Sequence, residues 1–459
     1  MGASFTQITS LAKRRGFIFQ GSEIYGGLAN TWDYGPLGVE LKNNIKNFWW
    51  KKFVQKRSNI FGLDSAILMN AKVWEASGHV GGFSDPLIDC RSCKNRFRAD
   101  KLLADYYNKE DMAEISEGLD AHELLAKLSD YQIKCPICGK RDFTEIRTFN
   151  LMFQTHQGVT QDSQSLVYLR PETAQGIFVN FKNIYHSSRA KIPFGVAQIG
   201  KAFRNEISPS NFIFRTREFE QMEIEYFCHP DNSLSEFKIW QKTCYQWLLD
   251  IGIRPELIKL REHEAKELSH YSQATTDIEF AFPFGWGELW GLAHRGDYDL
   301  SQHQKVSGKD LRYFDALANK HYLPHVIEPS LGVDRLLLAL LFSAYHEDEV
   351  DGEKRTVLKL SNRLAPIQVG ILSLTKKQIL VAQKLADKLS DDYMVDLDVS
   401  GSIGKRYRRH DEIGTPYCVT VDFETEQDQQ VTVRHRDTME QKRVGLDQLG
   451  VYLEECFKE

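Results

Sequence analysis

The sequence lacks any apolar run long enough to cross a membrane. Its longest apolar stretch is Leu336–Phe342, whereas a membrane-spanning helix needs about 20 such residues. We therefore expect this stretch to lie in a buried helix and the protein to have no membrane partner. A hydrophobic secretory segment is also missing, and eight cysteines are too few for the dense disulfide framework of a small secreted domain. These absences favour a reducing, cytoplasmic compartment.

A strong net charge is missing as well. The 58 Lys and Arg residues against 63 Asp and Glu residues give a formal net charge of -5. A nucleic acid would thus have to be bound by local basic patches rather than by the field of the whole molecule. Internal repeats and low-complexity tracts are absent too. What is present is 459 residues, 42% of them hydrophobic, which is too long for one ordinary domain and predicts two or three.

Four of the eight cysteines form two pairs with a two-residue spacer, Cys90 with Cys93 and Cys135 with Cys138. This spacing lets both thiolates of a pair face one ion, and two such pairs complete a tetrahedral four-thiolate site. Because the protein would fill all four ligand positions, the sequence predicts a structural zinc ion. The alternative is a redox pair, which typically uses a single Cys-x-x-Cys at the start of a helix. The doubled pattern favours zinc.

The chain divides into three regions around this zinc signature. Between the cysteine pairs, residues 98–129 are rich in charge and have helical spacing, which predicts a helical insert over 86–145 that the metal closes at its base. The flanking residues 1–85 and 146–363 predict one discontinuous domain of α+β class, built on an antiparallel sheet of six or seven strands.

A change of pattern follows residue 363. Alternating β and α units there predict a separate α/β domain over 364–459. Its expected elements are strands at 367–372, 394–399, 417–422 and 430–433 and a helix at 376–389.

The most informative segment runs from Phe203 to Glu206 and resumes at Arg217–Glu223. We expect two neighbouring strands here, with Arg204 and Glu206 on one face of the first. The second strand would place four side chains on one face, namely Phe219, Gln221, Glu223 and Glu225. A row of half-buried acids costs stability unless ligands or partners satisfy it, so the pattern indicates a site. A solvated outer face of the sheet is the alternative.

Three motifs in order give the chain its resemblance to the class II aminoacyl-tRNA synthetases, and specifically to the dimeric glycyl-tRNA synthetases. Asp33–Gly38 is similar to the first motif, Arg204–Glu223 to the second and Glu328–Arg335 to the third. Ser330 stands where many members of the class have glycine, and Glu-Pro-Ser-Leu-Gly is the variant typical of the glycine enzymes. The resemblance covers nearly the whole chain and implies a homodimer, formed through the first motif, with ATP, glycine and tRNA(Gly) as its substrates.

The resemblance also implies roles in ATP binding. Arg204 would hold the α-phosphate and Arg335 the γ-phosphate, and both guanidinium groups suit the negative charge that develops when a carboxylate attacks the α-phosphate. Glu206 would bind the adenine amino group, Phe219 would stack on the ring, and Glu288 would serve ATP and its Mg²⁺. Further ATP contacts are expected from Asn205, Phe214, Arg215, Leu289 and Gly332. The alternative for each arginine is an ordinary surface ion pair.

Glycine offers only its ammonium group, its carboxylate and its small size for recognition. By resemblance, the ammonium group would be bound by Glu172, Glu223 and Glu328. Ser330 would crowd the α-carbon, and Arg98 would neutralise the substrate carboxylate. Larger amino acids would be excluded by overlap, so no editing site is required.

The C-terminal region resembles the anticodon-binding module shared by the glycine, histidine, proline and threonine enzymes. Its expected RNA-facing stretches are Lys405–His410 and Arg434–Arg436, in which arginines could contact phosphates and Tyr407 could stack on a base. The three residues assigned to the anticodon region are Arg406, Arg408 and Arg409. A solvated charged face is the alternative.

Three other functions remain open at this point. A ligase for another small amino acid, such as alanine or serine, would keep the chemistry and change the pocket. A non-catalytic accessory subunit of a DNA polymerase would share the fold and could lose the ATP-binding arginines, but Arg204 and Arg335 are both present. A zinc-ribbon binding protein would account for only a small part of the chain.

Overall fold

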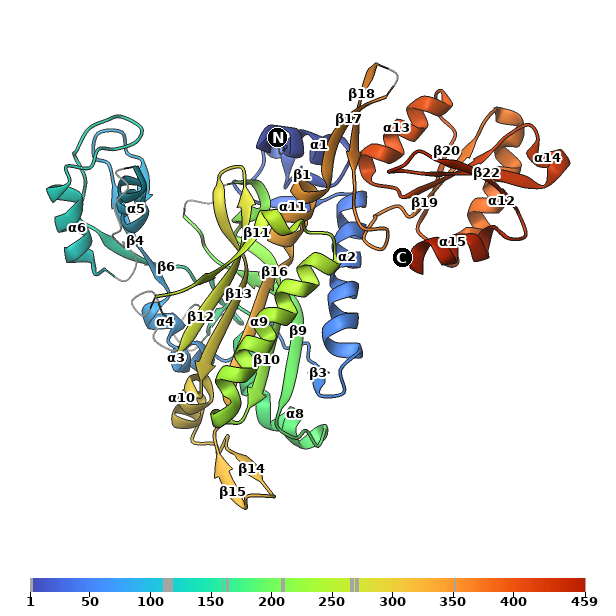
Figure 1. Ribbon diagram of the computed structural model, residues 1–459. Helices are drawn as coiled ribbons and strands as arrows, with labels where there is room; N and C mark the ends of the chain where they lie inside the picture. Colours follow the sequence, from blue (N-terminus) through green and yellow to red (C-terminus); the bar gives the residue numbers. More distant parts are fainter. Residues whose placement is uncertain are drawn as a thin grey trace.

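The fold is known from a computed structural model, which describes residues 3–109, 119–159, 161, 165–207, 211–264, 268, 272–350 and 352–458. A central sheet with its helices forms the core. The cysteine-bearing insert and the C-terminal domain lie on opposite sides of it (Figure 1). The part of the expected helical insert at 110–118 lies outside the described residues.

The central sheet has seven strands in the order β11-β12-β13-β16-β10-β9-β3. Neighbouring strands are antiparallel except β3 and β9, which run parallel. The expected sheet is therefore confirmed, with one parallel edge strand added. The strands are β3 (Ile60–Gly62), β9 (Phe194–Phe203), β10 (Glu218–Cys228), β11 (Ile258–Glu262), β12 (Ala274–Phe282), β13 (Gly285–Gly296) and β16 (His325–Gly332).

The two faces of this sheet carry different side chains. On β10, Met222, Ile224 and Tyr226 join the main hydrophobic cluster, which packs under α2 (Pro36–Trp50), α9 (Ser233–Asp250) and α11 (Val333–Ala344). Because successive side chains of a strand point to opposite faces, Glu223 and Glu225 lie on the other face. That face is covered by α7 (Ala174–Val179) and α8 (Phe181–Ser187), and we call it the site side.

One strand assignment from the sequence is wrong. β9 ends at Phe203, so Arg204, Asn205 and Glu206 lie in the segment after it rather than on it. The ladder nevertheless continues for one step, because the amide of Arg204 donates to the carbonyl of Arg217 at 2.9 Å. After this hydrogen bond the backbone leaves the sheet.

A buried carboxylate joins the three motifs. Asp334, in the first turn of α11, accepts a hydrogen bond from Tyr34 and contacts Lys42 Nζ at 3.1 Å. It also accepts from the amide of Glu220 at 2.8 Å. Tyr34 ends β2 (Trp32–Tyr34) and Lys42 lies on α2, so one side chain connects the first, second and third motifs. The apolar stretch that follows Asp334 forms the buried helix α11, as expected.

The insert has both helices and strands. It contains α5 (Ala99–Lys109) and α6 (Ala121–Asp130), and it joins the core through a three-stranded sheet of β4 (Ser84–Asp89), β5 (Arg96–Arg98) and β6 (Arg147–Asn150). The start of β4 and all of β6 lie outside the expected bounds 86–145. Its hydrophobic cluster is separate from that of the core. The helices agree with the expectation, and the sheet that carries them was missed because its strands are only a few residues long.

The C-terminal domain is close to expectation. Its sheet has the order β20-β19-β21-β22-β23, with the parallel strands β20 (Val395–Asp398), β19 (Val369–Ser373) and β21 (Tyr417–Val421) followed by the antiparallel β22 (Gln430–His435) and β23 (Gln441–Gly445). Its helices are α12 (Ile379–Leu389), α13 (Ile403–Ile413), α14 (Thr425–Asp428) and α15 (Leu449–Lys458). The hairpin of β17 (Tyr345–Val350) and β18 (Glu353–Leu358) leads from α11 to this domain and packs against α13.

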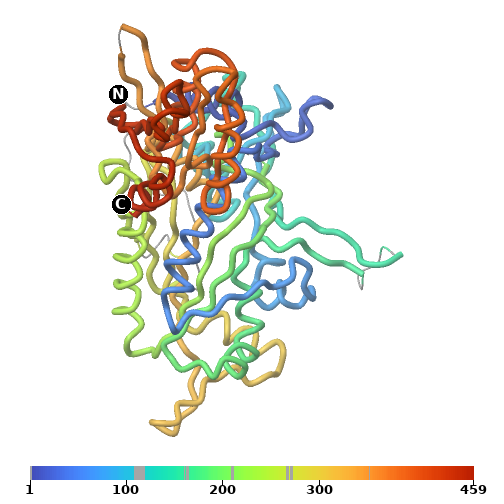
Figure 2. The backbone as a smooth tube through the Cα atoms, turned by 90° about the vertical axis from the view of Figure 1, so that its right-hand side faces the viewer, coloured from blue at the N-terminus to red at the C-terminus, as the bar shows by residue number. Residues whose placement is uncertain are grey.

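Shorter elements complete the fold. The hairpin of β7 (Gln154–His156) and β8 (Leu166–Tyr168) projects from the body on the side away from α9 (Figure 2). The others are α1 (Phe5–Arg14), β1 (Ile18–Gln20), α3 (Ala71–Ala76), α4 (His79–Gly82), α10 (Tyr298–Ser307), β14 (Tyr313–Asp315) and β15 (Lys320–Tyr322). Among the described residues, none of the helices combines the length and apolar character that a bilayer crossing needs.

Candidate active site

A cavity of about 370 Å³ opens on the site side of the central sheet. It brings together most of the residues that the sequence predicted for ATP and glycine. These are Glu172, Arg204, Glu206, Phe214, Arg215, Phe219, Glu223, Glu288, Leu289, Glu328, Ser330, Gly332 and Arg335. Arg98 and Asn205 are not part of its lining. The cavity thus has an arginine-rich end and an acidic end.

Arg204 is fixed at the arginine-rich end. Its Nε donates to the carbonyl of Pro171 at 3.0 Å, and its guanidinium lies 5.3 Å from the ring centroids of both Phe83 and Phe219. Contacts between a guanidinium and aromatic faces are favourable and hold the planar group in place. Because one carbonyl and two rings define its position, the group is oriented before any ligand arrives.

Arg335 is held in a comparable way. Its Nη1 donates to the carbonyl of Glu288 at 2.9 Å and to Glu288 Oε2 at 3.0 Å, while its Nε donates to the carbonyl of Phe214 at 3.2 Å. The guanidinium also lies 4.4 Å from the Phe214 ring centroid. Glu288 and Arg335 are therefore an ion pair in this structure, at the mouth of the cavity.

The segment after β9 contributes Glu206 to the same end. Arg215 Nη1 lies 3.7 Å from Glu206 Oε2, and Glu206 is 9% exposed. Asn205 has a different position, since its amide donates to the carbonyl of Leu151 at 2.7 Å. Asn205 thus fixes the backbone of this segment and does not reach the cavity.

Three glutamates form the acidic end, each with its own partner. The hydroxyl of Thr173 donates to Glu223. Glu172 lies 3.3 Å from His79 Nε2 and accepts from Gln175 at 3.0 Å. Glu328 is paired with Arg295. Gln221 donates to Ser330 at 3.3 Å, which places the serine hydroxyl beside these acids.

The ionisation of these acids differs because their surroundings differ. Burial raises the pKa of Glu328 to about 8, although Arg295 opposes the shift. Burial and the charge of Glu172 raise the pKa of Glu223. For Glu172, burial acts in the same direction, but His79 and Arg295 outweigh it and the pKa is lowered. The acidic end therefore holds a charged Glu172 beside acids that keep their protons more readily.

Sequence reasoning missed Arg295. Its side chain is 3% exposed and donates to Asp299 at 2.7 and 2.8 Å in a bidentate pair, besides its contact with Glu328. Arg98, the predicted partner of the substrate carboxylate, instead pairs with Asp85 at 3.0 Å and with Asp100 at 2.6 Å. Of these two arginines, Arg295 is the one in contact with an acid of the cavity. The signal that could have identified Arg295 was its position in a strand shortly before the Tyr298-Asp299 pair.

The strand pattern in the sequence placed Glu225 on the same face as Glu223, as observed, but gave it no functional role. It is fully buried, and neither carboxylate oxygen has a hydrogen-bond partner within the described part of the chain. Carboxylate oxygens of Glu223, Glu225 and Glu328 all lie within 4.8 Å of one another. Burial and then the charge of Glu328 raise the pKa of Glu225 well above its usual value. An isolated buried carboxylate is costly, so the neutral acid is the stable form of this side chain.

A second pair of acids lies beside Arg335. A methyl group on Gly291 would be 3.2 Å from Glu288 Oε1 and 3.8 Å from Asp277 Oδ1, so the two carboxylates converge over this glycine. His263 Nε2 lies 2.7 Å from Asp277 Oδ2. Burial and Glu288 raise the pKa of Asp277 to about 6. Two converging carboxylates are a ligand set suited to Mg²⁺, and Asp277 was not identified from the sequence.

The four predicted zinc ligands come together in the insert. Their sulfur atoms all lie within 4.8 Å of one another, with Sγ–Sγ distances of 3.6 Å for Cys90–Cys138 and Cys93–Cys135. Both pairs have the same turn, because the amides of Lys94 and Gly139 donate to the carbonyls of Cys90 and Cys135. The φ angles are +60° at Lys94 and +72° at Gly139. This arrangement fits a tetrahedral ion.

The predicted RNA-facing arginines lie on α13 and differ in exposure. Arg406 is 4% exposed, and its guanidinium donates to the carbonyls of Ser373, Asp398 and Gly401. Contrary to expectation, Arg406 is thus an internal structural residue. Arg409 pairs with Asp398, and Arg408 lies 3.8 Å from Asp411; both retain an accessible surface.

Comparisons with known proteins show the family and agree with this fold. The family model described as the tRNA synthetase class II core domain (G, H, P, S and T) matches residues 153–344, and the anticodon binding domain matches residues 368–455. A glycine–tRNA ligase of Alkaliphilus metalliredigens (strain QYMF) is 59% identical over 456 residues, which cover 99% of each chain. One of Clostridium acetobutylicum is 59% identical over 455 residues, covering 98% of each.

A solved structure shows the likeness in fold. The prolyl-tRNA synthetase from Cryptosporidium parvum, complexed with L-proline and AMP, superposes with a TM-score of 0.62 at 12% identity. The match covers 98% of this chain and 77% of that one. At this identity the likeness concerns the fold alone.

Proposed function

The chain belongs to the glycine–tRNA ligase family of class II aminoacyl-tRNA synthetases, and from this premise we propose that the cavity on the site side binds ATP at its arginine-rich end and glycine at its acidic end. Such an enzyme joins glycine to ATP with release of pyrophosphate, and then transfers the glycyl group to the 3′ end of its tRNA. The observation that carries the proposal is that one cavity brings Arg204 and Arg335 together with Glu172, Glu223 and Glu328.

Activation is an attack of the glycine carboxylate on the α-phosphate, and negative charge grows there in the transition state. Arg204 is assigned to the α-phosphate because its carbonyl and ring contacts orient it in advance. Arg335 is assigned to the γ-phosphate, near the N-terminus of α11, where backbone amides add positive potential. Adenine would stack on Phe219, with Glu206 accepting from its amino group. The remaining contacts would come from Phe214, Arg215, Leu289 and Gly332.

Mg²⁺ bound with ATP would neutralise phosphate charge. Glu288 and Asp277 are the residues proposed to hold it, because their carboxylates converge over Gly291. Binding of ATP would then separate Glu288 from Arg335 and leave the guanidinium to the γ-phosphate. Asn205 supports this end only through its backbone, since its amide fixes the segment that carries Arg204 and Glu206.

At the acidic end, Glu172, Glu223 and Glu328 would bind the ammonium group of glycine, with Ser330 limiting the space beside the α-carbon. A charged acid attracts the ammonium group, and acids that remain neutral limit the repulsion among the three. Arg98 is the residue expected to meet the substrate carboxylate, and Arg295, which contacts Glu328, is a second candidate for this role.

Four further assignments extend the proposal beyond the cavity. Cys90, Cys93, Cys135 and Cys138 would hold one structural zinc ion. Arg408 and Arg409 would contact the anticodon region of tRNA(Gly). The proposed domains are a discontinuous catalytic domain over 1–85 and 146–363, the zinc-bearing insert over 86–145 and the anticodon-binding domain over 364–459. The enzyme is proposed to be cytoplasmic.

The homodimer is proposed to form through the segment around the first motif. Large apolar side chains are exposed there, with Ile24 88%, Tyr25 86% and Leu28 58% exposed. Exposed apolar groups gathered in one short segment are typical of a surface that a partner covers.

Glycine-dependent exchange between ATP and pyrophosphate tests the cavity directly. Arg204→Ala should lower the exchange rate by about 10²–10³-fold, since a preorganised group that meets developing charge contributes about this much. Alanine, serine and histidine tested in parallel should give no exchange. Arg312→Ala, which removes a surface arginine paired with Asp310, is the control and should leave the rate unchanged. An active Arg204→Ala enzyme would contradict the assignment.

A further inference from the structure

The C-terminal domain contacts the core through buried charges. Arg355, on β18, is 1% exposed and Asp411, on α13, is fully buried. Arg355 Nη1 donates to Asp411 Oδ2 at 3.4 Å and to the carbonyl of Arg436 at 3.0 Å. On the hairpin itself, Arg355 Nε donates to Asp348 Oδ1 at 2.7 Å. A single guanidinium therefore joins the two strands of the hairpin to α13 and to the turn that follows β22 in the C-terminal domain.

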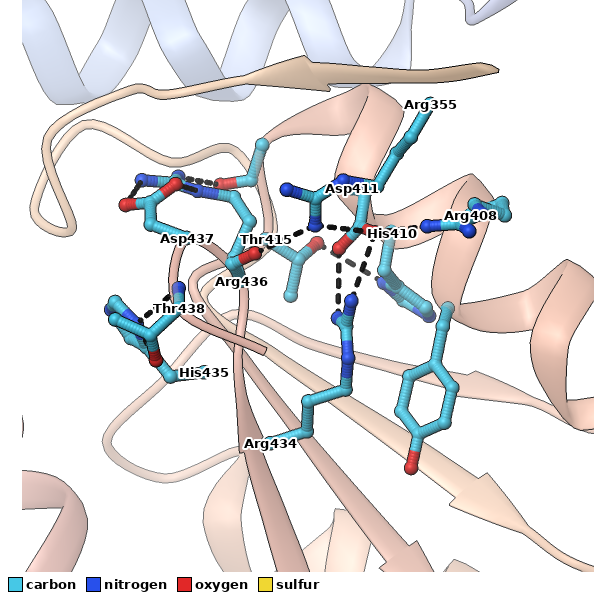
Figure 3. Close-up of polar contacts among 12 residues, drawn as sticks. Arg355, Arg408, His410, Asp411, Thr415, Arg434, His435, Arg436, Asp437 and Thr438 are labelled. Atoms are coloured by element: carbon cyan, nitrogen blue, oxygen red, sulfur yellow. Dashed lines mark hydrogen bonds and ion pairs between the residues drawn. The ribbon is translucent and has the colours of Figure 1, made fainter. Parts of the chain in front are cut away.

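Asp411 is the acceptor at the centre of this contact (Figure 3). Arg434, on β22, donates to it from Nη1 at 2.9 Å and from Nη2 at 3.1 Å, and Arg408 Nη1 lies 3.8 Å away. Arginines of β18, β22 and α13 thus converge on one carboxylate. Arg434 and Arg408 belong to the same domain as Asp411, so Arg355 is the member of the set that crosses between domains.

Other contacts hold α13 against the core at the same place. Glu412, next to Asp411, pairs with Arg15 and lies 3.3 Å from Arg14 Nη2, at the end of α1. Gly414, with φ +83°, ends α13 so close to β18 that an added methyl group would lie 3.0 Å from the Leu358 carbonyl. The side chain of Ile413 is part of the main hydrophobic cluster of the core. α13 is therefore the helix through which the C-terminal domain packs on the core. Its consecutive acids Asp411 and Glu412 contact β18 and the end of α1.

Stability alone does not account for the charged pair. Removing two charges from water costs free energy that their attraction often fails to offset, so an apolar pair of similar volume would serve stability as well. What the charged pair adds is geometry, because a planar guanidinium that bonds Asp348, Asp411 and the Arg436 carbonyl together accepts few orientations. The contact therefore holds the two domains together and also fixes the angle between them.

We propose that Arg355 and Asp411 are positioning residues that fix the orientation of the C-terminal domain on the core, so that a tRNA held at its anticodon presents its 3′ end to the cavity. The inference rests on the proposed binding of the anticodon by the C-terminal domain. Neither residue touches a substrate. Their effect is confined to the second step of the reaction, because glycine activation requires only the core.

The test compares three measurements on Arg355→Gln in the full chain: glycine-dependent pyrophosphate exchange, charging of tRNA(Gly), and binding of an isolated anticodon stem-loop. We expect exchange and stem-loop affinity to stay within about twofold of the original protein. The kcat/KM for tRNA should fall about tenfold, within the range of coupling between distant sites. Arg355→Lys keeps the charge without the planar fork and should lose about threefold. Lys354→Gln, at an exposed position of the same strand, should lose nothing.

Asp411→Asn and the double variant give an independent check. If the two residues act through one contact, the double variant should be no worse than the more impaired single variant, whereas independent effects would multiply. A fall in exchange equal to the fall in charging would show a general structural defect and overturn the proposal. Equal loss of stem-loop affinity in Arg355→Gln would show a local RNA contact and overturn it too. A wild-type protein without stem-loop binding would instead refute the proposed anticodon role.

Discussion

Single residues decide how the acidic end of the cavity responds to pH. Glu328 has a pKa raised from 4.5 to about 8, with burial as the main cause. Between these values the folded protein keeps a proton that the unfolded chain has lost. The stability contributed by Glu328 is therefore fully present below pH 4.5 and is lost as the pH rises toward 8.

Glu328→Gln should accordingly flatten the dependence of melting temperature on pH between about 5 and 8, because the amide has no proton to lose. Melting temperatures of the ligand-free protein across this range provide the measurement. Glu75→Gln, an exposed site on α3, is the control and should keep the original slope. An unchanged slope in Glu328→Gln would show that another group carries the pH dependence.

Residues in sequence motifs could be predicted, and residues that depend on packing could not. Arg204, Phe219 and Arg335 line the cavity as expected because each stands in an ordered motif. Arg295 and Asp277 were missed because no local pattern distinguishes a strand arginine or aspartate that faces a site from one that faces solvent. Arg406 was misassigned for the same reason, since a run of arginines does not reveal which one is buried.

At the scale of elements, α2 packs closely against the backbone at Phe17, just before β1. A methyl group at Gly38 would lie 1.9 Å from the carbonyl oxygen of Phe17, so Gly38→Ala must shift the helix or that backbone. We expect the free energy of unfolding of the core to fall by about 2 kcal/mol. Urea unfolding followed by tryptophan fluorescence measures it. Gly81→Ala, with open space around the added methyl group, should change it by less than about 0.5 kcal/mol.

The proposed zinc site predicts that the insert depends on its four cysteines, because its hydrophobic cluster is separate from the core and small. Replacing Cys90 and Cys135 together with serine should remove the bound zinc and lower the melting temperature of the insert, since the binding energy of a structural ion is folding energy. Metal analysis and calorimetry provide the measurements. Cys456→Ser, outside the four-cysteine cluster, should keep the zinc. Unchanged metal content and melting in the double variant would refute the site.

At the scale of the whole molecule, the exposed apolar segment near the first motif predicts association. Ile24→Glu should convert a dimer into monomers, because a charge buried in an apolar interface is costly. Sedimentation equilibrium over a range of concentrations measures this. Leu317→Glu, at a fully exposed leucine far along the chain, should leave the mass unchanged. A monomeric original protein would rule out the proposed dimer.

The sequence by itself determined the family, the order of the class II core and the anticodon binding domain, the strand alternation of β10 and the grouping of the four cysteines. These properties depend on neighbours along the chain, on a period of two residues or on a two-residue spacer. The tertiary structure decided which charges are partnered: Arg295 with Glu328, Arg335 with Glu288, and Arg355 with Asp411. Each pair joins strands or helices distant in the sequence, and burial strengthens its effect, so only the packed fold determines what each charge contacts.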